Sequence, residues 1–288
     1  MSGFKTQIAW SASTDTGPYR SNNEDSFIAL KVNGEGVYRL GTWGEDYIEE
    51  SDFVFAVSDG MGGAKSGDFA SQVVVEQIAL LFPKVFKSQA QGLIVYFQDV
   101  LMELVSNVHT ALNQMGLAYS ELEGMGATLS LCWLRMDRMY FVHVGDSRIY
   151  HLSKTGNFDQ LTRDHTHVGW LKERGELSDY EARNDPRRNI LQQVIGGKTQ
   201  HLNPQFGELV LDGKDRLLLC TDGLYEGLLD SALKRKLDFT HPFRSAESSE
   251  SSSLSEAMVA SSILEDGKDN TTALCIEISD EENEARSS

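Results

Sequence analysis

The sequence predicts an α+β fold in which antiparallel sheets are stacked and flanked by helices. Two long stretches place their apolar residues on one helical face, and many shorter stretches have the length and composition of strands. Several of these strands follow one another closely, with glycine or charged turns between them, as in antiparallel hairpins. A chain of 288 residues, 40% of them hydrophobic, is long enough to bury a substantial core.

The first part of the chain contains three predicted strands followed by two predicted helices. The strands cover residues 6–11, 26–32 and 53–57. The apolar positions of the two helices, each set at helical spacing, are Ala70, Val74, Ile78 and Leu81, and then Phe97, Leu101, Leu104, Val108 and Leu112. Neither helix carries a metal or cofactor motif, so both are predicted to pack against a sheet.

Strands dominate the prediction after residue 127. Four short strands, expected to form antiparallel hairpins, lie within residues 127–134, 138–145, 147–152 and 157–162. The polar stretch 163–188 interrupts them and contains two short helical pieces. The remaining strands are predicted at 189–195, 205–211, 216–221 and 271–278.

No shift in composition marks a domain boundary, so residues 1–279 are expected to form a single domain. Within it, the glycine-rich, acidic stretch 33–50 is interpreted as a long hairpin loop inserted between strands. The Ser-rich stretch 244–253 is interpreted as a mobile linker. The charged residues 280–288 are expected to be a disordered tail.

Acidic residues outnumber basic ones by 43 to 26, which gives a net charge of −17. A surface of this sign repels nucleic-acid phosphates and anionic lipid, so neither is expected as a partner. The N-terminus lacks the pattern of a signal peptide, and no apolar run approaches the roughly 18 residues that span a bilayer. The three cysteines lie in apolar, strand-like runs and are interpreted as buried thiols in a reducing compartment. We therefore expect a cytoplasmic protein.

Four acidic clusters, far apart in the chain, are the strongest functional signal. They are Asn23-Glu24-Asp25, Asp59-Gly60, Asp222-Gly223 and Asp269-Asn270. Asp59 and Asp222 each close an apolar run and Asp269 precedes one, so these carboxylates are expected at strand ends. A glycine beside an Asp lets the backbone approach an ion closely, because glycine has no Cβ.

Carboxylates in this pattern suit Mg²⁺ or Mn²⁺, which prefer oxygen ligands. The sequence offers no convergent set of His or Cys that would indicate zinc instead. Two such ions about 3.5–4 Å apart share a water, lower its pKa and hold a phosphoryl group for in-line attack. Arg20, shortly before the first cluster, has the fork geometry that binds phosphate oxygens.

With these clusters in place, the chain resembles the metal-dependent serine/threonine protein phosphatases of type 2C in their compact bacterial form. The matching motifs run almost from end to end: Thr14-Asp15, Gly17, Arg20 and Asn23-Glu24-Asp25; Asp59-Gly60-Met61-Gly62-Gly63; Gly126-Ala127-Thr128; Val144-Gly145-Asp146-Ser147-Arg148; Leu161-Thr162-Arg163-Asp164-His165; Arg188-Asn189; Thr221-Asp222-Gly223-Leu224; and Asp269-Asn270-Thr271. The resemblance implies an αββα sandwich, in which two antiparallel sheets lie between helices, and a flap formed by residues 163–188.

The resemblance also implies which residues hold the metals. Asp59 would bridge two Mg²⁺ or Mn²⁺ ions, and the Gly60 carbonyl would bind one of them. Asp222 and Asp269 would hold the first ion. The shared water would then hydrolyse phosphoserine or phosphothreonine on a protein substrate.

Further residues take supporting roles in the same comparison. Glu24 would serve the second metal through its water shell, and Asp25 would orient a water or a nearby ligand. Arg20 would bind the substrate phosphate and, with the bridging residue, carry catalysis. A third, weaker metal is implied at Asp146 and Asp222, with Glu226 nearby.

Three departures from the family pattern stand out. Met61 occupies a position where animal members carry a His, proposed to protonate the leaving group, so another acid is needed here. Glu226 replaces a usual Asp near the third metal. The flap has Asn184-Asp185-Pro186-Arg187 where His-Pro-Arg is common.

The expected partners are phosphorylated proteins, the substrates of a Ser/Thr kinase, and the enzyme is expected to be a monomer. Two alternative interpretations stay open. An inactive relative that binds phosphoproteins is opposed by the complete set of carboxylates. A partner-switching regulatory phosphatase is opposed by the lack of room for a sensory domain.

A metal site at His165 and His167 would need a third ligand that the sequence does not indicate.

Overall fold

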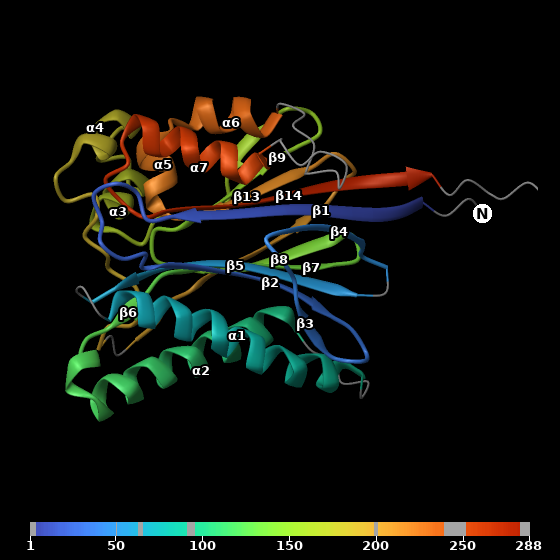
Figure 1. The fold of residues 1–288 in the computed structure, drawn as a ribbon, viewed down its shortest axis with the longest axis horizontal. Coiled ribbons are helices and arrows are strands. Elements are labelled where there is room, and N and C mark those ends of the chain that lie inside the picture. Colours follow the sequence, from blue (N-terminus) through green and yellow to red (C-terminus); the bar gives the residue numbers. More distant parts are fainter. Residues whose placement is uncertain are drawn as a thin grey trace, which may run out of the picture.

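The computed structural model describes residues 4–49, 51–62, 66–90, 96–198, 201–238 and 252–282. Two antiparallel sheets lie face to face, and helices cover the outer face of each, which gives four layers (Figure 1). The predicted α+β class is therefore confirmed, in the αββα form that the resemblance implies. Among the described residues, no helix is long and apolar enough to cross a membrane.

The two sheets have different sizes. The six-stranded sheet has the order β10 (Phe158–Gln160), β9 (Arg148–Leu152), β13 (Arg216–Cys220), β14 (Thr271–Glu282), β1 (Phe4–Asp15) and β4 (Trp43–Tyr47). The eight-stranded sheet has the order β11 (Ile195–Gly196), β6 (Gly126–Ala127), β5 (Asp52–Met61), β7 (Leu129–Arg135), β8 (Arg138–Val144) and β12 (Gln205–Val210), with β2 (Asp25–Val32) paired to β5 and to β3 (Val37–Arg39).

The helices form the two outer layers. Those on the larger sheet are α1 (Gly67–Ala90) and α2 (Phe97–Ala118), followed by the short η1 (Ser120–Leu122). Those on the smaller sheet are α5 (Asp222–Gly227), α6 (Asp230–Asp238) and α7 (Leu254–Glu265). The predicted flap contains α3 (His167–Glu173) and α4 (Asp179–Asn184), so its two expected helical pieces are confirmed.

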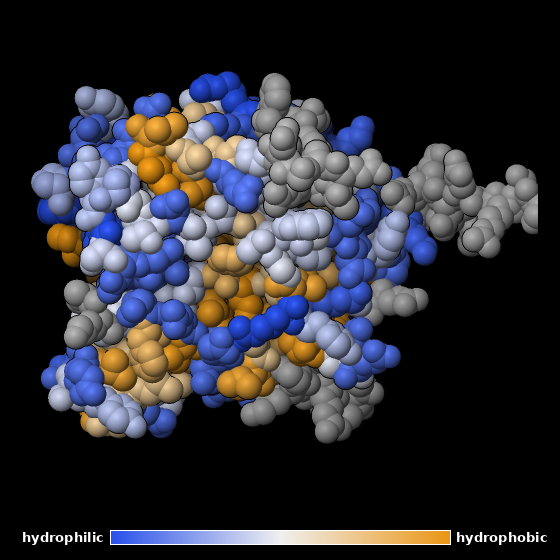
Figure 2. All heavy atoms as spheres, in the orientation of Figure 1, coloured by the Kyte–Doolittle hydropathy of each residue, from blue (hydrophilic) through white to orange (hydrophobic). Residues whose placement is uncertain are grey.

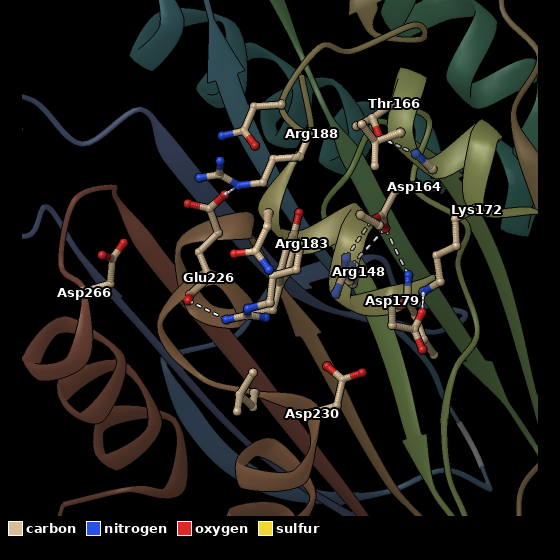
Figure 3. Close-up of a pocket in the computed structure, with 18 of the residues that line it drawn as sticks. Arg148, Asp164, Thr166, Lys172, Asp179, Arg183, Arg188, Glu226, Asp230 and Asp266 are labelled. Atoms are coloured by element: carbon tan, nitrogen blue, oxygen red, sulfur yellow. Dashed lines mark hydrogen bonds and ion pairs between the residues drawn. The ribbon is translucent and has the colours of Figure 1, made fainter. Parts of the chain in front are cut away.

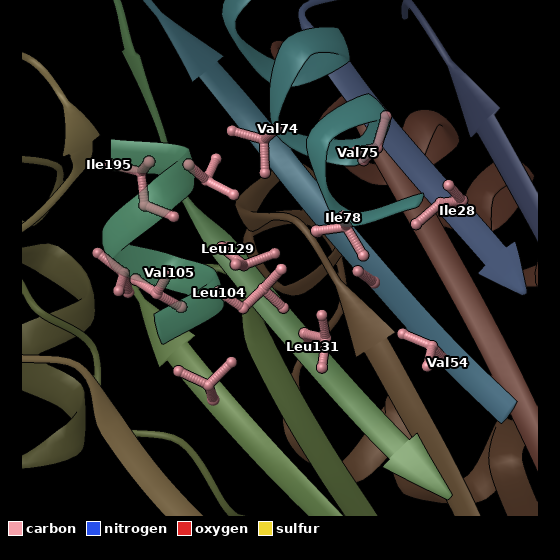
Figure 4. Packing of buried hydrophobic residues seen from close by; sticks show 14 of the residues in the cluster. Ile28, Val54, Val74, Val75, Ile78, Leu104, Val105, Leu129, Leu131 and Ile195 are labelled. Carbon is pink, nitrogen blue, oxygen red and sulfur yellow. The ribbon is translucent and has the colours of Figure 1, made fainter. Parts of the chain in front are cut away.

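Three apolar clusters hold the layers together. The first joins α1 and α2 to the larger sheet, where Ile78 and Leu104 meet Leu131 in a fully apolar layer (Figure 4). The second fills the space between the sheets, and the third lies under α5, α6 and α7. Each fully buried aliphatic side chain of this kind contributes roughly 1.5–3 kcal/mol relative to an exposed one. On the face shown in Figure 2, hydrophilic residues cover most of the surface and hydrophobic residues form smaller areas between them.

The predicted strand at 189–195 is wrong except for its last residue. Only Ile195 belongs to a strand, β11. The preceding residues cross the end of the sandwich, where the Gln192 N–H donates to the His165 carbonyl and the Ile190 N–H to the Arg187 carbonyl. These local bonds to the flap replace the ladder that a strand would need.

The predicted hairpin between 138–145 and 147–152 is also wrong. β8 belongs to the larger sheet and β9 to the smaller one, so residues 145–147 carry the chain from one sheet to the other. Gly145 has a φ of +107°, and a Cβ there would lie 2.6 Å from the Thr128 side chain. A sharp crossing without a side chain therefore replaces the expected turn.

Two segments interpreted as loops contain regular structure. Within 33–50, β3 pairs with β2, and β4 forms the edge of the smaller sheet beside β1. β14 continues to Glu282, three residues into the expected tail, because residues 280–282 pair with Thr6, Lys5 and Phe4. Residues 283–288 lie outside the described residues.

The helix α7 starts at the end of the Ser-rich stretch and was not predicted from the sequence. The Ser253 hydroxyl accepts the Glu256 N–H, and the Glu256 carboxylate accepts the Ser253 N–H, which together form a capping box for α7. Residues 244–251 lie outside the described residues. The S-x-x-E pattern at 253–256 was the available signal for this helix start.

Ser253→Ala removes the capping hydroxyl of α7. We expect a loss of about 1 kcal/mol in the free energy of unfolding, because a backbone N–H of the first helical turn is left unpaired. The shift in the urea midpoint at constant slope measures it. Ser252→Ala, at the exposed neighbouring position, is the matched control and should behave as wild type. A midpoint for Ser253→Ala equal to that of the control would contradict this assignment.

Asp52 gives the fold a pH dependence. Burial raises the pKa of Asp52 to about 6, against the opposing effects of Arg135 and of the Trp133 hydrogen bond. The unfolded carboxyl has a pKa of about 3.9, so the folded protein holds the proton more tightly. The resulting stabilisation is present below about pH 4 and is lost as the pH rises to about 6.

Asp52→Asn keeps an oxygen for Trp133 but does not titrate in this range. We therefore expect the melting temperature of the wild type to fall relative to that of the Asn variant between pH 4 and pH 6, with both proteins measured in the same buffers. Parallel curves over this range would show that the Asp52 pKa is not raised.

Candidate metal centre

The cavity that holds the predicted site lies at one end of the sandwich, where two loops join the sheets. Residues 16–24 lead from the end of β1 in the smaller sheet to the start of β2 in the larger one. Residues 145–147 lead from β8 to β9. This is the end at which β1 finishes and β14 begins, on the left of Figure 1. Carboxylates that follow or precede strands of both sheets therefore meet there.

The cavity has a volume of about 420 Å³. Its acidic lining residues come from both sheets and are Glu24, Asp59, Asp146, Asp222 and Asp269. Gly60 and Arg20 also line it. All predicted metal ligands except Asp25 and Glu226 thus border one space.

Asp25 lies directly behind the cavity wall. It is opposite Asp59 in the register of β2 and β5. The hydroxyls of Thr221 and Thr272 each donate to its Oδ2 at 2.7 Å, which ties the larger sheet to two strands of the smaller one. Its other oxygen, Oδ1, is buried and has no hydrogen-bond partner among the described residues. The same is true of Asp222 Oδ1.

Asp59 is held in place by Thr128. The Asp59 N–H donates to the Thr128 hydroxyl at 2.9 Å, and the Thr128 N–H donates back to the Asp59 carbonyl at 2.8 Å. The Thr128 hydroxyl also shares a 2.6 Å hydrogen bond with Ser147 in the loop that carries Asp146. One buried threonine thus supports both Asp59 and the loop that carries Asp146.

Glu24 and Gly60 meet at the start of α1. A Cβ on Gly60 would lie 1.9 Å from the Gly67 carbonyl oxygen, and a Cβ on Gly67 would lie 2.6 Å from the Glu24 carboxyl carbon. The two glycines allow the end of β5, the first turn of α1 and the Glu24 side chain to pack closely. A side chain at Gly60 would have to move the backbone, and a side chain at Gly67 would displace the Glu24 carboxylate.

Arg20 pairs with Asp269. The guanidinium Nη2 donates to Asp269 Oδ2 at 2.6 Å, and Nε donates to the Lys268 carbonyl at 3.3 Å. Because Asp269 Oδ1 accepts the Asn270 N–H at 2.8 Å, both oxygens of this carboxylate have protein partners. The structure therefore brings the predicted phosphate-binding residue and a predicted metal ligand into direct contact.

Asn270 is a positioning residue that the sequence motif contained but to which no role was assigned. Its side-chain amide donates to the carbonyls of Thr16 and Asn22, both at 2.9 Å, and its oxygen accepts the Glu24 N–H at 2.8 Å. One side chain just before β14 thus fixes the loop of residues 16–24 that joins β1 to β2. The Asp-Asn pair before a strand was the only signal for it.

The carboxylates raise one another's pKa. Burial is the main cause that raises the pKa of Asp59 and Asp222 well above its ordinary value, and neighbouring carboxyls add to it. Burial also raises the pKa of Asp25 and Asp146 to about 7 each. The cavity is therefore strongly electronegative, and cations bound there would offset a large unfavourable charge.

The donor set fits divalent cations that prefer oxygen. Carboxylates from five chain segments face one cavity, and Asp222 Oδ1 is a buried acceptor whose partner is absent among the described residues. Within the same residues, no three His, Cys, Asp or Glu side chains already form a compact metal-binding group.

Glu226 and the flap histidines lie elsewhere. Glu226 borders a neighbouring cavity and pairs with Arg188 at 3.0 Å. His165 accepts the Gly145 N–H through Nδ1 at 3.2 Å and lies beside the buried His143. His167 begins α3.

The αββα sandwich with a carboxylate-lined cavity at the joined ends of its sheets is the architecture expected of a metal-dependent protein phosphatase. Comparison with known proteins agrees. The family model described as protein phosphatase 2C matches residues 34–260. The chain therefore belongs to the protein phosphatase 2C family.

Relatives in several bacteria are similar over most of this chain. The protein phosphatase PhpP of Streptococcus pneumoniae is 30% identical over 223 residues, which cover 77% of this chain and 80% of the relative. The serine/threonine protein phosphatase PstP of Mycobacterium tuberculosis is 28% identical over 276 residues, which cover 95% of this chain but 45% of the relative. A crystal structure of the PstP catalytic domain in complex with two manganese ions matches with a TM-score of 0.72 at 26% identity, over 95% of this chain and 99% of that one.

Thr128→Val removes the hydroxyl that joins Asp59 to Ser147 while preserving shape. Because residues that support metal ligands typically change metal affinity by about 10–100-fold, we expect Mn²⁺ to bind at least tenfold more weakly. Isothermal titration calorimetry measures this directly. Thr110→Val, on the exposed face of α2, is the control. Unchanged Mn²⁺ affinity in the Thr128 variant would show that this hydroxyl does not position the site.

Proposed function

We propose that this chain hydrolyses phosphoserine and phosphothreonine on proteins with the help of two Mg²⁺ or Mn²⁺ ions. The observation that carries the proposal is the meeting of carboxylates from both sheets around one cavity, with Arg20 at its border. Membership of the protein phosphatase 2C family and the names of its bacterial relatives support the same reaction. The manganese complex of the PstP catalytic domain supports the choice of metal.

Each acidic residue has a proposed place. Asp59, near the end of β5, would hold both ions, and the Gly60 carbonyl would bind one of them. Asp222 and Asp269 would approach from the smaller sheet. Glu24 would act from the loop of residues 16–24. The buried Asp25 would orient a water or a nearby ligand. A weaker third ion would take Asp146 and Asp222, with Glu226 turned toward it from its present pair with Arg188.

Two such ions, when bound, lower the pKa of a water molecule and neutralise the phosphate charge during in-line attack. Arg20 binds phosphate oxygens with its guanidinium fork, for which it must exchange its contact with Asp269. Met61 lines the cavity but carries no proton to give. The proton for the leaving oxygen therefore comes from another group or from water.

Phosphorylated proteins, the targets of a Ser/Thr kinase, are the proposed partners. The relatives' names support this class of substrate without identifying its members. A partner-switching role would use the same catalytic centre. An inactive, phosphoprotein-binding relative would instead lack metal-dependent turnover, and this difference separates the alternatives.

Purified protein with Mn²⁺ is expected to hydrolyse p-nitrophenyl phosphate and a phosphothreonine peptide, and EDTA should abolish both activities. Asp59→Asn and Asp222→Asn should each reduce kcat at least 100-fold. Mn²⁺ should also raise the melting temperature of the wild type, because a ligand that binds only the folded state stabilises it. This thermal shift should be much smaller in Asp222→Asn.

Asp159→Asn, at an exposed position on β10, is the matched control and should keep both the activity and the thermal shift. A wild-type protein that binds Mn²⁺ but turns over neither substrate would favour the inactive, phosphoprotein-binding alternative. Full activity in EDTA would rule out the metal mechanism.

A further inference from the structure

A second cavity, of about 610 Å³, lies beside the metal cavity. Its walls are the flap helices α3 and α4 on one side and the segment from α5 to the start of α6 on the other (Figure 3). Asn189 lines both cavities, so the two are neighbours along the flap. Tyr225 and Glu226 of α5 border it only a few residues after Asp222.

The charges in this flap groove differ from those of the protein as a whole. The chain carries a net charge of −17. The cationic residues that line the groove are Arg148, Lys172, Arg183, Arg188 and Lys268, and the acidic ones are Asp164, Asp179, Glu226, Asp230 and Asp266. Basic and acidic groups are therefore equal in number in a protein that is otherwise strongly acidic.

Most of these charges are already paired. Arg148 holds both oxygens of Asp164, at 2.9 and 2.6 Å. Lys172 pairs with Asp179 at 2.7 Å. Arg188 pairs with Glu226, and Lys268 pairs with Asp266. These pairs leave little charge for a ligand.

Arg183 is different. Its Nη2 donates to the backbone carbonyl of Glu226 at 2.7 Å, and within the described part of the chain it forms no ion pair. A guanidinium has five N–H donors, so most of those on Arg183 remain for a ligand. In Figure 3, Arg183 and Arg188 both approach Glu226, from opposite sides. This side of the groove adjoins the metal cavity, because Arg188 directly precedes Asn189.

We propose that the flap groove binds an anionic side chain of the substrate, an acidic or a second phosphorylated residue, through Arg183. The proposal rests on the proposed phosphatase function, since the phosphate to be hydrolysed lies in the adjoining cavity. A guanidinium fork matches a carboxylate or a phosphate in geometry as well as in charge. The net charge of the chain alone would predict the reverse preference, for basic residues near the phosphate.

In the part of this groove that the structure describes, a basic substrate residue has only one candidate binding group, Asp230. Asp230 has no ion pair among the described residues, but its carboxylate accepts the Tyr150 hydroxyl at 3.3 Å. A basic substrate residue would therefore have to contact Asp230, a carboxylate that already accepts a hydrogen bond.

The experiment uses phosphothreonine peptides on one neutral scaffold, with Asp or Lys placed at each of the four positions on either side. At low ionic strength we expect kcat/KM for the Asp peptide to exceed that for the Lys peptide by about fivefold at one or two adjacent positions, mainly through KM. The ratio should shrink at high salt, because exposed charges are screened. A phosphothreonine in place of the preferred Asp should give at least the same effect.

Arg183→Ala should bring the Asp-to-Lys ratio at that position close to one, and Arg183→Glu should reverse it. Arg187→Ala is the matched control: this flap arginine is exposed, pairs with Asp185 and lies outside the groove, so the ratio should be unchanged. The charge reversal keeps the test informative even if the Ala variant is less stable.

A Lys preference at every position, equal rates for all peptides, or an Asp preference that survives in Arg183→Glu would overturn the inference while leaving the phosphatase function intact. A wild-type protein that hydrolyses no peptide and no p-nitrophenyl phosphate with Mn²⁺ would overturn the proposed function and this inference together.

Discussion

The structure depends on a concentration of negative charge that the protein itself does not neutralise. Asp59, Asp146 and Asp222 come from different sheets and loops and border one cavity, where burial and mutual repulsion raise their pKa values. These carboxylates would repel one another and separate unless the surrounding structure kept them in place. The fold keeps them in place, and bound cations would then lower the free energy of the assembled site.

The groups that keep these carboxylates in place are mostly uncharged hydroxyls and amides. Thr128 fixes Asp59, two threonines fix Asp25, and Asn270 fixes the loop that carries Arg20 and Glu24. Hydroxyls and amides position carboxylates without cancelling their charge, which preserves the attraction for cations. The flap groove follows the opposite rule, because there most charges are compensated by ion pairs and one arginine is left over.

The sequence predicts the fold class and the identity of the acidic residues well, because both follow from local patterns. Apolar spacing revealed α1 and α2, and Asp at the ends of apolar runs revealed the site. The crossing at Gly145 was not predictable from the same patterns, since a short turn between two strands looks alike whether the strands pair or belong to different sheets.

Contacts between distant residues were equally invisible in the sequence. Nothing near Thr128 indicates that it supports Asp59, and the ion pair of Arg20 with Asp269 joins segments at opposite ends of the chain. The strand expected at 189–195 failed because its backbone bonds to the flap, whose position only the tertiary structure defines. Sequence patterns thus predicted the acidic residues that line the cavity but not the groups that orient them.

The pairing of β1 with β14 has a consequence for biogenesis. β1 lies between β4 and β14, and Asp15 stands opposite Thr271, so β1 is made long before β14. At synthesis rates of about 5–20 residues per second, β1 waits on the order of ten seconds or more for its neighbour. Asp269 arrives immediately before that neighbour. The nascent chain therefore lacks Asp269, one of the proposed metal ligands, until the segment just before β14 has been made.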